Sequence, residues 1–188
     1  MPARSIHLIQ RFFGSVCARS VVAEDEDWVA HLLTGPELEL WRGLGRTDKV
    51  ESVDVARRFI SNPVVADAQP SNKEALVAAA LLHDIGKADS QLGTSSRVLA
   101  TVSGRLAGPQ RSGLWIKRRG LKGRIGSYLH HAEIGADLIR AAGGRELVAS
   151  WAGVHHDPAR WETSGIPISI CRALARADGE SVVGDLAD

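Results

Sequence analysis

A continuous apolar stretch near the middle of the chain constrains its fold more than any other feature. Residues 75–82 read A-L-V-A-A-A-L-L, so a helix formed here has almost no polar face. Pro70, followed by Ser71 and Glu74 at the spacing of a capping box, predicts where this helix begins. The helix is expected to end at His83-Asp84, with Gly86 available as a C-terminal stop. The stretch therefore predicts a helix buried in the core.

The other segments also show helical periodicity, without convincing strand alternation, so we expect an all-α fold. Apolar residues on one face predict a helix over 50–60 that stops near Ser61-Asn62-Pro63. Three later helices are expected, from about Tyr128 to Gly143-Gly144, over 145–155 and over 168–177.

The chain is expected to have two parts. Its 188 residues fit one domain with some decoration. Residues 1–46, which include Trp28 and Trp41, predict an N-terminal helical extension packed on a bundle formed by residues 47–188. Within the bundle, residues 88–127 are rich in glycine and predict an insert or lid rather than core.

The insert concentrates positive charge, although the whole chain has a net charge of only +1. Its basic residues are Arg97, Arg105, Arg111, Lys117, Arg118, Arg119, Lys122 and Arg124. A lid over an anionic substrate would explain them, with Arg118 and Arg119 as candidate phosphate contacts. Nucleic-acid binding through phosphates, or membrane-surface binding with Leu114-Trp115-Ile116, are alternatives, and so is a solvated loop without a ligand.

Composition narrows the class of protein. Cys17 and Cys171 lie far apart, which argues against a disulfide scaffold or a zinc finger and favours a reduced, cytoplasmic setting. The first 22 residues lack the apolar run of a secretory signal, and no segment has enough apolar residues to span a bilayer. We therefore expect a soluble cytoplasmic protein, whose oligomeric state stays open.

Five of the seven histidines fall into three clusters: His83, His130-His131 and His155-His156. Asp84 adjoins the first cluster, and Asp178 follows the last expected helix. Divalent cations bind carboxylate oxygens and neutral imidazoles, and the end of a helix favours a cation through its dipole. His7 and His31 have no partner at ligand spacing. The pattern predicts a metal site in which His155 and His156 both bind metals, or one binds a metal and the other a phosphate.

The order of four motifs, H-D-I-G-K, H-H-A-E-I-G-A, V-H-H-D and A-R-A-D, resembles that of HD-domain phosphohydrolases. It looks closest to the branch that includes cyclic-dinucleotide phosphodiesterases, and the resemblance covers roughly residues 47–179. The resemblance implies an all-α HD-domain bundle that holds one or two divalent ions of Mn, Fe or Mg. The implied ligands are His83, Asp84, His131, His155, His156 and Asp178. Lys87 is similar to a family lysine that contacts substrate phosphate, so Asp84 and Lys87 are the expected catalytic residues.

The sequence departs from this pattern at two places. Glu51 stands where the family usually has an early histidine; it either replaces that histidine as a ligand or marks a lost metal position. After His155-His156, the glycine-tyrosine-proline signature of the cyclic-di-GMP branch is absent, since Ile166 lies between Gly165 and Pro167. The resemblance therefore gives no cyclic-di-GMP specificity.

The expected activity is hydrolysis of a phosphate ester or diester, with a nucleotide as the expected substrate. Metal ions would lower the pKa of a bound water, Asp84 would bridge two of them, and Lys87 would stabilise charge on the phosphate. The alternative is a degenerate HD domain that binds a nucleotide or a partner protein without turnover, which the presence of Glu51 keeps open.

Overall fold

The computed structural model describes residues 23–66, 70–90, 120, 125–126 and 129–179. Within these ranges the regular elements are all helical, which confirms the expected all-α fold. The elements are α2 (Ala23–Leu32), α3 (Gly35–Arg42), α4 (Arg46–Ile60), α5 (Pro63–Ala66), α6 (Pro70–Leu82), α7 (Lys87–Ser90), α11 (His131–Ala142), α12 (Glu146–Val154), the 3-10 helix η1 (Pro158–Thr163) and α13 (Ile168–Ala177).

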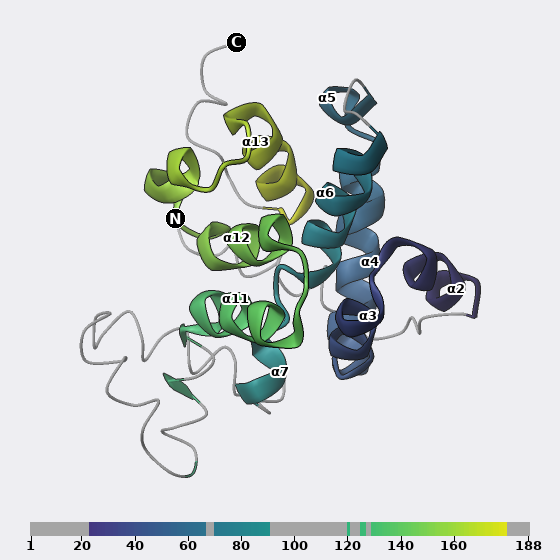
Figure 1. Cartoon of the computed structure of the whole chain (residues 1–188), viewed down its shortest axis with the longest axis vertical. Coiled ribbons are helices and arrows are strands. Elements are labelled where there is room, and N and C mark those ends of the chain that lie inside the picture. Colours follow the sequence, from purple (N-terminus) through teal and green to yellow (C-terminus); the bar gives the residue numbers. More distant parts are fainter. Residues whose placement is uncertain (1–22, 67–69, 91–119, 121–124, 127–128, 180–188) are drawn as a thin grey trace, which may run out of the picture.

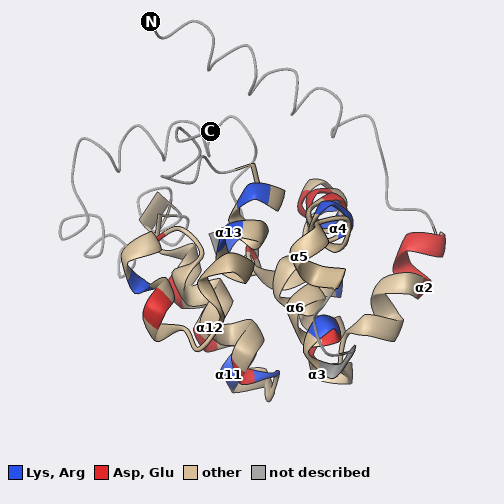
Figure 2. Ribbon diagram, turned by 90° about the horizontal axis from the view of Figure 1, so that it is seen from above, with Lys and Arg blue, Asp and Glu red and all other residues tan. Residues whose placement is uncertain are grey.

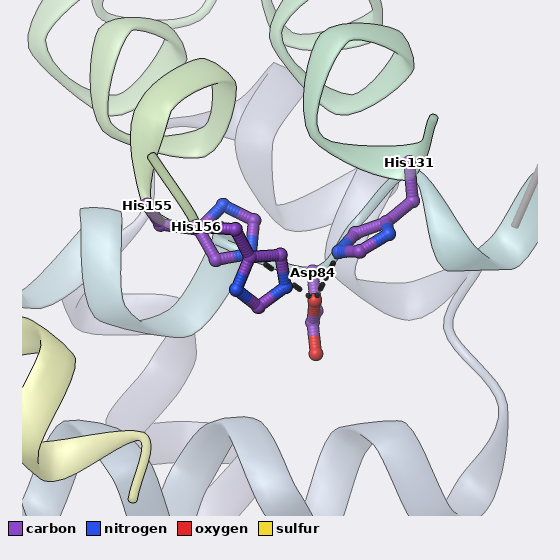
Figure 3. Close-up of side chains that lie close together, drawn as sticks. All are labelled: Asp84, His131, His155 and His156. Atoms are coloured by element: carbon purple, nitrogen blue, oxygen red, sulfur yellow. Dashed lines mark ion pairs between the residues drawn. The ribbon is translucent and has the colours of Figure 1, made fainter. Parts of the chain in front are cut away.

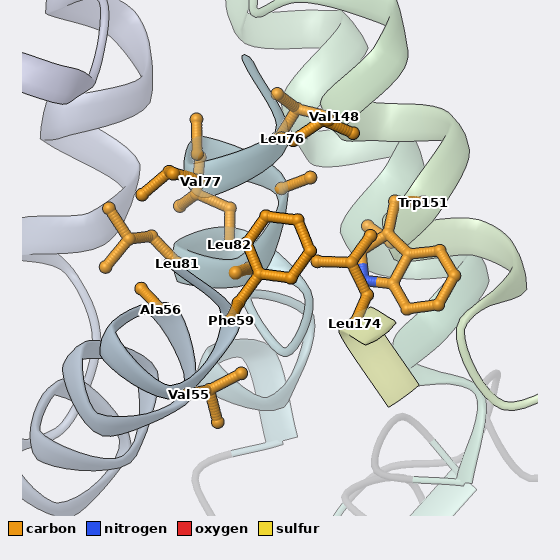
Figure 4. Close-up of a cluster of buried hydrophobic side chains, with 14 of the residues drawn as sticks. Val55, Ala56, Phe59, Leu76, Val77, Leu81, Leu82, Val148, Trp151 and Leu174 are labelled. Carbon is orange, nitrogen blue, oxygen red and sulfur yellow. The ribbon is translucent and has the colours of Figure 1, made fainter. Parts of the chain in front are cut away.

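Helix α6 lies at the centre of the bundle and packs on both α4 and α12 (Figure 1). From Leu76 to Leu82 no side chain is more than 4% exposed, which confirms the buried helix expected from the apolar stretch. Phe59 of α4, Trp151 of α12 and Leu174 of α13 pack in the same core as Leu82 (Figure 4). The core thus joins helices that are far apart in the sequence.

The N-cap predicted for this central helix is wrong, whereas its end lies within one residue of the expected one at His83-Asp84. The helix begins at Pro70, so Ser71 lies inside it rather than at its N-cap. Proline suits a first helical position, because its fixed φ fits a helix and its missing N–H has no partner there. At the other end the helix stops at Leu82, before a turn that runs to Gly86, and α7 begins at Lys87.

The other expected helices match the structure closely. Helix α4 ends at Ile60 as expected, and α13 has the predicted bounds. Gly143 ends α11 with a φ of +80°, the left-handed conformation that favours glycine at a helix C-terminus. Helix α11 begins at His131, whereas Tyr128, its expected start, is outside the described residues. Between α12 and α13 the chain forms the 3-10 helix η1.

An N-terminal layer of α2 and α3 packs on this bundle. Both helices contact α6, and α3 also contacts α11. The fully buried carboxylate of Glu37 in α3 accepts hydrogen bonds from the backbone N–H of Arg145 at 2.9 Å and from its guanidinium at 2.6–3.2 Å. Burial alone would raise the pKa of Glu37, but these hydrogen bonds outweigh it and lower the pKa. The layer is therefore attached to the residue that precedes α12.

Charged side chains of both signs lie on the described helices, with an acidic start to α2 and mixed charges on α4 (Figure 2). None of the described helices is long and apolar enough to cross a membrane. The eight basic residues of the insert and the apolar triplet at 114–116 lie outside the described residues.

Gly86 is required by a close approach of two backbones rather than by a helix stop. A Cβ atom at Gly86 would lie 2.0 Å from the carbonyl oxygen of His131 and 2.7 Å from the amide nitrogen of Gly135. From the opposite side, a Cβ at Gly135 would lie 3.1 Å from the amide nitrogen of Gly86. The glycine pair thus allows the first turn of α11 to rest directly on the turn after His83-Asp84.

We expect Gly86→Ala to lower the free energy of unfolding by about 1–3 kcal/mol, the usual cost of overpacking a close contact. The matched control is Gly35→Ala, because a Cβ at Gly35 meets no atom within 4 Å. Urea unfolding of both variants measures the difference. Equal stability of the two variants would contradict the proposed role of Gly86.

Candidate metal centre

Three helix C-termini and one N-terminus deliver the candidate site residues. His83 and Asp84 follow the last residue of α6, His155 and His156 follow that of α12, and Asp178 follows that of α13. His131 is the first residue of α11. A helix C-terminus carries a partial negative charge from its unpaired carbonyl groups. The meeting of three such ends favours a cation.

The carboxylate of Asp84 is the centre of the cluster (Figure 3). Its Oδ1 lies 3.0 Å from Nε2 of His131 and 3.6 Å from Nε2 of His155. Its Oδ2 lies 3.3 Å from Nε2 of His83 and forms an ion pair with Nζ of Lys87. Oδ1 thus faces His131 and His155, whereas Oδ2 faces His83.

Asp178 extends the cluster on the Oδ2 side. Its Oδ1 lies 3.2 Å from Nε2 of His83, so His83 stands between two carboxylates. The side chain of His83 is only 2% exposed. Asp178, which is separated from His83 by 95 positions in the sequence, therefore joins the same site.

Backbone carbonyls fix the orientation of two of the histidines. Nδ1 of His83 lies 2.9 Å from the carbonyl oxygen of Ala80, and Nδ1 of His155 lies 2.8 Å from that of Ala152. A carbonyl only accepts hydrogen bonds, so Nδ1 must carry the proton in both rings. In the neutral ring, Nε2 then carries no proton, and its lone pair is available to a ligand. For His155 this nitrogen faces Asp84, and for His83 it faces both Asp84 and Asp178.

This arrangement fits a bound cation. The buried Nε2 atoms of His83 and His155 and the buried Oδ1 of Asp84 make no hydrogen bond to any described residue. An unsatisfied buried acceptor costs about 1–3 kcal/mol, and lone pairs that face a carboxylate also repel it. A metal ion bound by these atoms would remove both costs, as expected for histidines whose other nitrogen is held by a carbonyl.

Four residues form a compact donor set: Asp84, His131, His155 and His156 can each offer one atom, all within 4.8 Å of one another. The His155 and His156 ring centroids are 3.9 Å apart, and those of His131 and His156 are 5.0 Å apart. Of the four, only His156 is exposed to solvent. Three imidazoles and one carboxylate suit a transition metal, and the exposed side offers access for a ligand.

The charges of Asp84 and Asp178 act on Glu51. Burial raises the pKa of Glu51; the positive charge of Lys87 opposes this rise, and the carboxylates of Asp84 and Asp178 add to it. Glu51, which stands in place of the expected early histidine, is therefore within electrostatic range of both Asp84 and Asp178. A cation there would stabilise its ionised form.

The pKa values of the cluster reflect competition between burial and neighbouring charge. Burial disfavours the charged form of His83, but Asp84 and Asp178 outweigh it and raise the pKa of His83 well above its usual range. Burial would raise the pKa of Asp84, but Lys87 and His83 hold it well below its usual range. The pKa of Asp178 is lowered mainly by His83, against the effect of its own burial. Both carboxylates are thus anionic near neutral pH.

His130 and His31 are not among the four residues of the compact donor set. Nδ1 of His130 is 4.0 Å from a carboxylate oxygen of Glu133, and the ring of His31 contacts the carbonyl oxygen of Asp27 on α2. His7, Arg118 and Arg119 lie outside the described residues. The sequence analysis missed the carbonyls of Ala80 and Ala152; the signal for them is a histidine three residues after an alanine at the end of an apolar helix.

A cleft of about 370 Å³ lies between α11, α12 and η1, and it contains none of the cluster residues. Its charged groups are already paired, since Arg140 binds Glu146 at 2.7 Å and Arg160 is 4.0 Å from Glu133. The chemistry of the clustered histidines and carboxylates, rather than the size of this cleft, therefore identifies the candidate site.

These features define an all-α domain with a histidine and aspartate group that is able to hold a metal. The family model of the HD domain matches residues 50–182, which is more than half of the chain. The chain therefore belongs to the HD domain family, whose members bind divalent metals and are typically metal-dependent phosphohydrolases. Every described residue of the candidate site falls within the matched range. No curated protein and no solved structure matches the chain.

The buried state of His155 predicts a pH dependence of stability in the metal-free protein. Burial lowers the pKa of His155 from 6.5 to about 4. Between these values the unfolded chain binds a proton at this position and the folded chain does not, so stability falls as pH decreases from 6.5 to 4. We expect His155 to contribute a slope of up to about 1.4 kcal/mol per pH unit.

Urea unfolding of the wild type and His155→Gln in EDTA, at several pH values within this window, measures the slope. The variant is expected to lose stability less steeply than the wild type as pH decreases. Parallel curves for the two proteins would show that His155 is not buried in its neutral form.

Proposed function

We propose that this protein is a metal-dependent phosphohydrolase or phosphodiesterase that acts on a nucleotide or another phosphate ester. The main support is the buried Asp84 carboxylate, which lies among the Nε2 atoms of His83, His131 and His155, all of them potential metal ligands. Family membership adds to this support, because HD domains are typically metal-dependent phosphohydrolases.

The two oxygens of Asp84 suggest two metal positions. Oδ1 with His131, His155 and His156 would hold one ion, and Oδ2 with His83 and Asp178 would hold the other. We propose Glu51 as a further ligand of the second ion, because it stands where the family usually has an early histidine and the charges of Asp84 and Asp178 act on it. Mn, Fe and Mg all suit such mixed oxygen and nitrogen sites.

The bound ions would supply a water of lowered pKa and neutralise phosphoryl charge. The chain itself would contribute orientation and positive charge. Lys87 is only 15% exposed and is paired with Asp84, and in this proposal its ammonium group would stabilise negative charge on a substrate phosphate. Exposed His156 marks the side from which we expect substrate to approach.

The additional histidines at 131, 155 and 156 support a relation to the branch of the family that includes cyclic-dinucleotide phosphodiesterases. Ile166, which replaces the tyrosine of the cyclic-di-GMP signature, is 4% exposed and packs in the hydrophobic core. It therefore offers no polar group to a substrate, and we do not extend the proposal to cyclic-di-GMP.

Other parts of the proposal rest on sequence alone. Arg118 and Arg119 would contact substrate phosphate, and the basic insert would act as a lid over an anionic substrate or would bind nucleic acid or a membrane surface. The cytoplasm is the expected location. A degenerate HD domain that binds a nucleotide without turnover remains the competing hypothesis, and catalytic assays separate it from the enzyme.

We expect Asp84→Asn to abolish phosphate release and to remove bound metal, because the neutral amide has only one oxygen and cannot offer two anionic ligand atoms to the ions. Activity is measured as phosphate release from a panel of nucleotides and cyclic dinucleotides with Mn²⁺, Mg²⁺ or Fe²⁺, and metal content by elemental analysis. The matched control is Asp137→Asn, an aspartate on α11 whose side chain is 84% exposed. It is expected to retain both metal and activity.

Two results would contradict the proposal in different ways. A wild-type protein that binds metal but releases no phosphate from any substrate would favour the binding domain. An Asp84→Asn variant that keeps its full metal content would show that the cluster is not the metal site.

A further inference from the structure

Arg58 of α4 contacts the end of the helix that delivers Asp178. Its Nε donates a hydrogen bond of 2.6 Å to the carbonyl oxygen of Ala177, 119 positions later in the sequence. Ala177 is the last residue of α13, and its carbonyl group belongs to the final turn, where oxygens lack partners within the helix. Arginine is suited to this contact, since it also balances the negative end of the helix dipole.

The contact fixes the residue directly before Asp178. Asp178 is the C-cap of α13 and has helical angles (φ −77°, ψ −7°), and its own N–H bonds to the carbonyl oxygen of Leu174. Immediately afterwards Gly179 turns the chain with a φ of +86°. Arg58 thus holds the last peptide unit before the carboxylate that lies 3.2 Å from His83.

Helix α4 carries both Arg58 and Glu51. The two residues are seven positions apart, almost two full turns, so they lie on the same side of the helix. Helices α4 and α13 pack on each other directly. One rigid helix therefore relates the positions of Glu51 and Asp178, which come from opposite ends of the matched domain.

We propose that Arg58 is a positioning residue that holds Asp178 in place for metal binding through the carbonyl group of Ala177. This inference rests on the proposed role of Asp178 as a metal ligand. Groups that orient metal ligands without touching the metal typically change its affinity by about 10–100-fold.

The neighbouring Arg57 provides a matched control. Arg57→Ala removes one positive charge, as Arg58→Ala does. The Arg57 side chain, however, forms an ion pair with Asp25 of α2 and lies over the ring of Trp28. Arg57→Ala therefore removes structural contacts of α4 that do not involve α13. A general loss of stability would affect both variants, whereas loss of positioning would affect only Arg58→Ala.

The test is calorimetric titration of the metal-free full chain with Mn²⁺ for the wild type, Arg58→Ala, Arg57→Ala and Asp178→Asn. We expect Arg58→Ala to weaken Mn²⁺ binding about 10-fold, Asp178→Asn to weaken it at least as much, and Arg57→Ala to bind like the wild type. Arg58→Lys retains the charge without the guanidinium Nε and should show a smaller loss in the same direction; it replaces Arg58→Ala if that variant does not fold.

Three results would overturn the inference. Wild-type affinity in the Arg58 variants, with weakened binding in Asp178→Asn, would remove the role of Arg58 and leave the proposed function intact. Equal weakening in Arg57→Ala and Arg58→Ala would assign the loss to stability. Unchanged binding in Asp178→Asn would remove Asp178 as a ligand, and with it both this inference and that part of the proposed metal centre.

Discussion

The burial of one carboxylate among histidines is the constraint on which the rest of the structure depends. Asp84 is only 8% exposed, and its neighbours His83 and His155 direct towards it nitrogens that carry no proton in the neutral ring. Part of this group is unfavourable by itself, because the buried Nε2 of His155 and the buried Oδ1 of Asp84 have lost water without gaining a hydrogen bond to any described residue. The fold therefore keeps unsatisfied polar atoms in its interior, which is typical of a site arranged for a ligand rather than for stability.

The surrounding architecture places these groups with few specialised residues. The apolar central helix α6 anchors the His83-Asp84 turn in the core, and the glycine pair at 86 and 135 lets α11 approach until His131 reaches Asp84. On the other side, the Glu37–Arg145 ion pair attaches the N-terminal layer to the start of α12, whose far end carries His155. Residues distant from the site thus determine its geometry through rigid helices.

The sequence predicts residues at helix ends well, because local patterns determine where helices end. His83, His155 and Asp178 each follow an apolar helical pattern, and the structure brings them together as expected, although their role as ligands stays a prediction. The contacts of Gly86 and Arg58 could not be predicted, since they depend on backbone groups far away in the sequence. The capping box at Ser71 failed because the local signal of Pro70 at a helix start is stronger.

The division of Asp84 between two sets of neighbours also bears on metal preference. Its Oδ1 faces His131 and His155, a nitrogen-rich half, whereas its Oδ2 faces His83 in the half that contains Asp178 and Glu51. Imidazole-rich sites suit iron and similar transition metals, while added carboxylates shift preference towards harder ions such as Mn²⁺ and Mg²⁺. Under the proposed two-metal arrangement, Glu51 would increase the contrast between the two halves, and the two ions would not need to be the same metal.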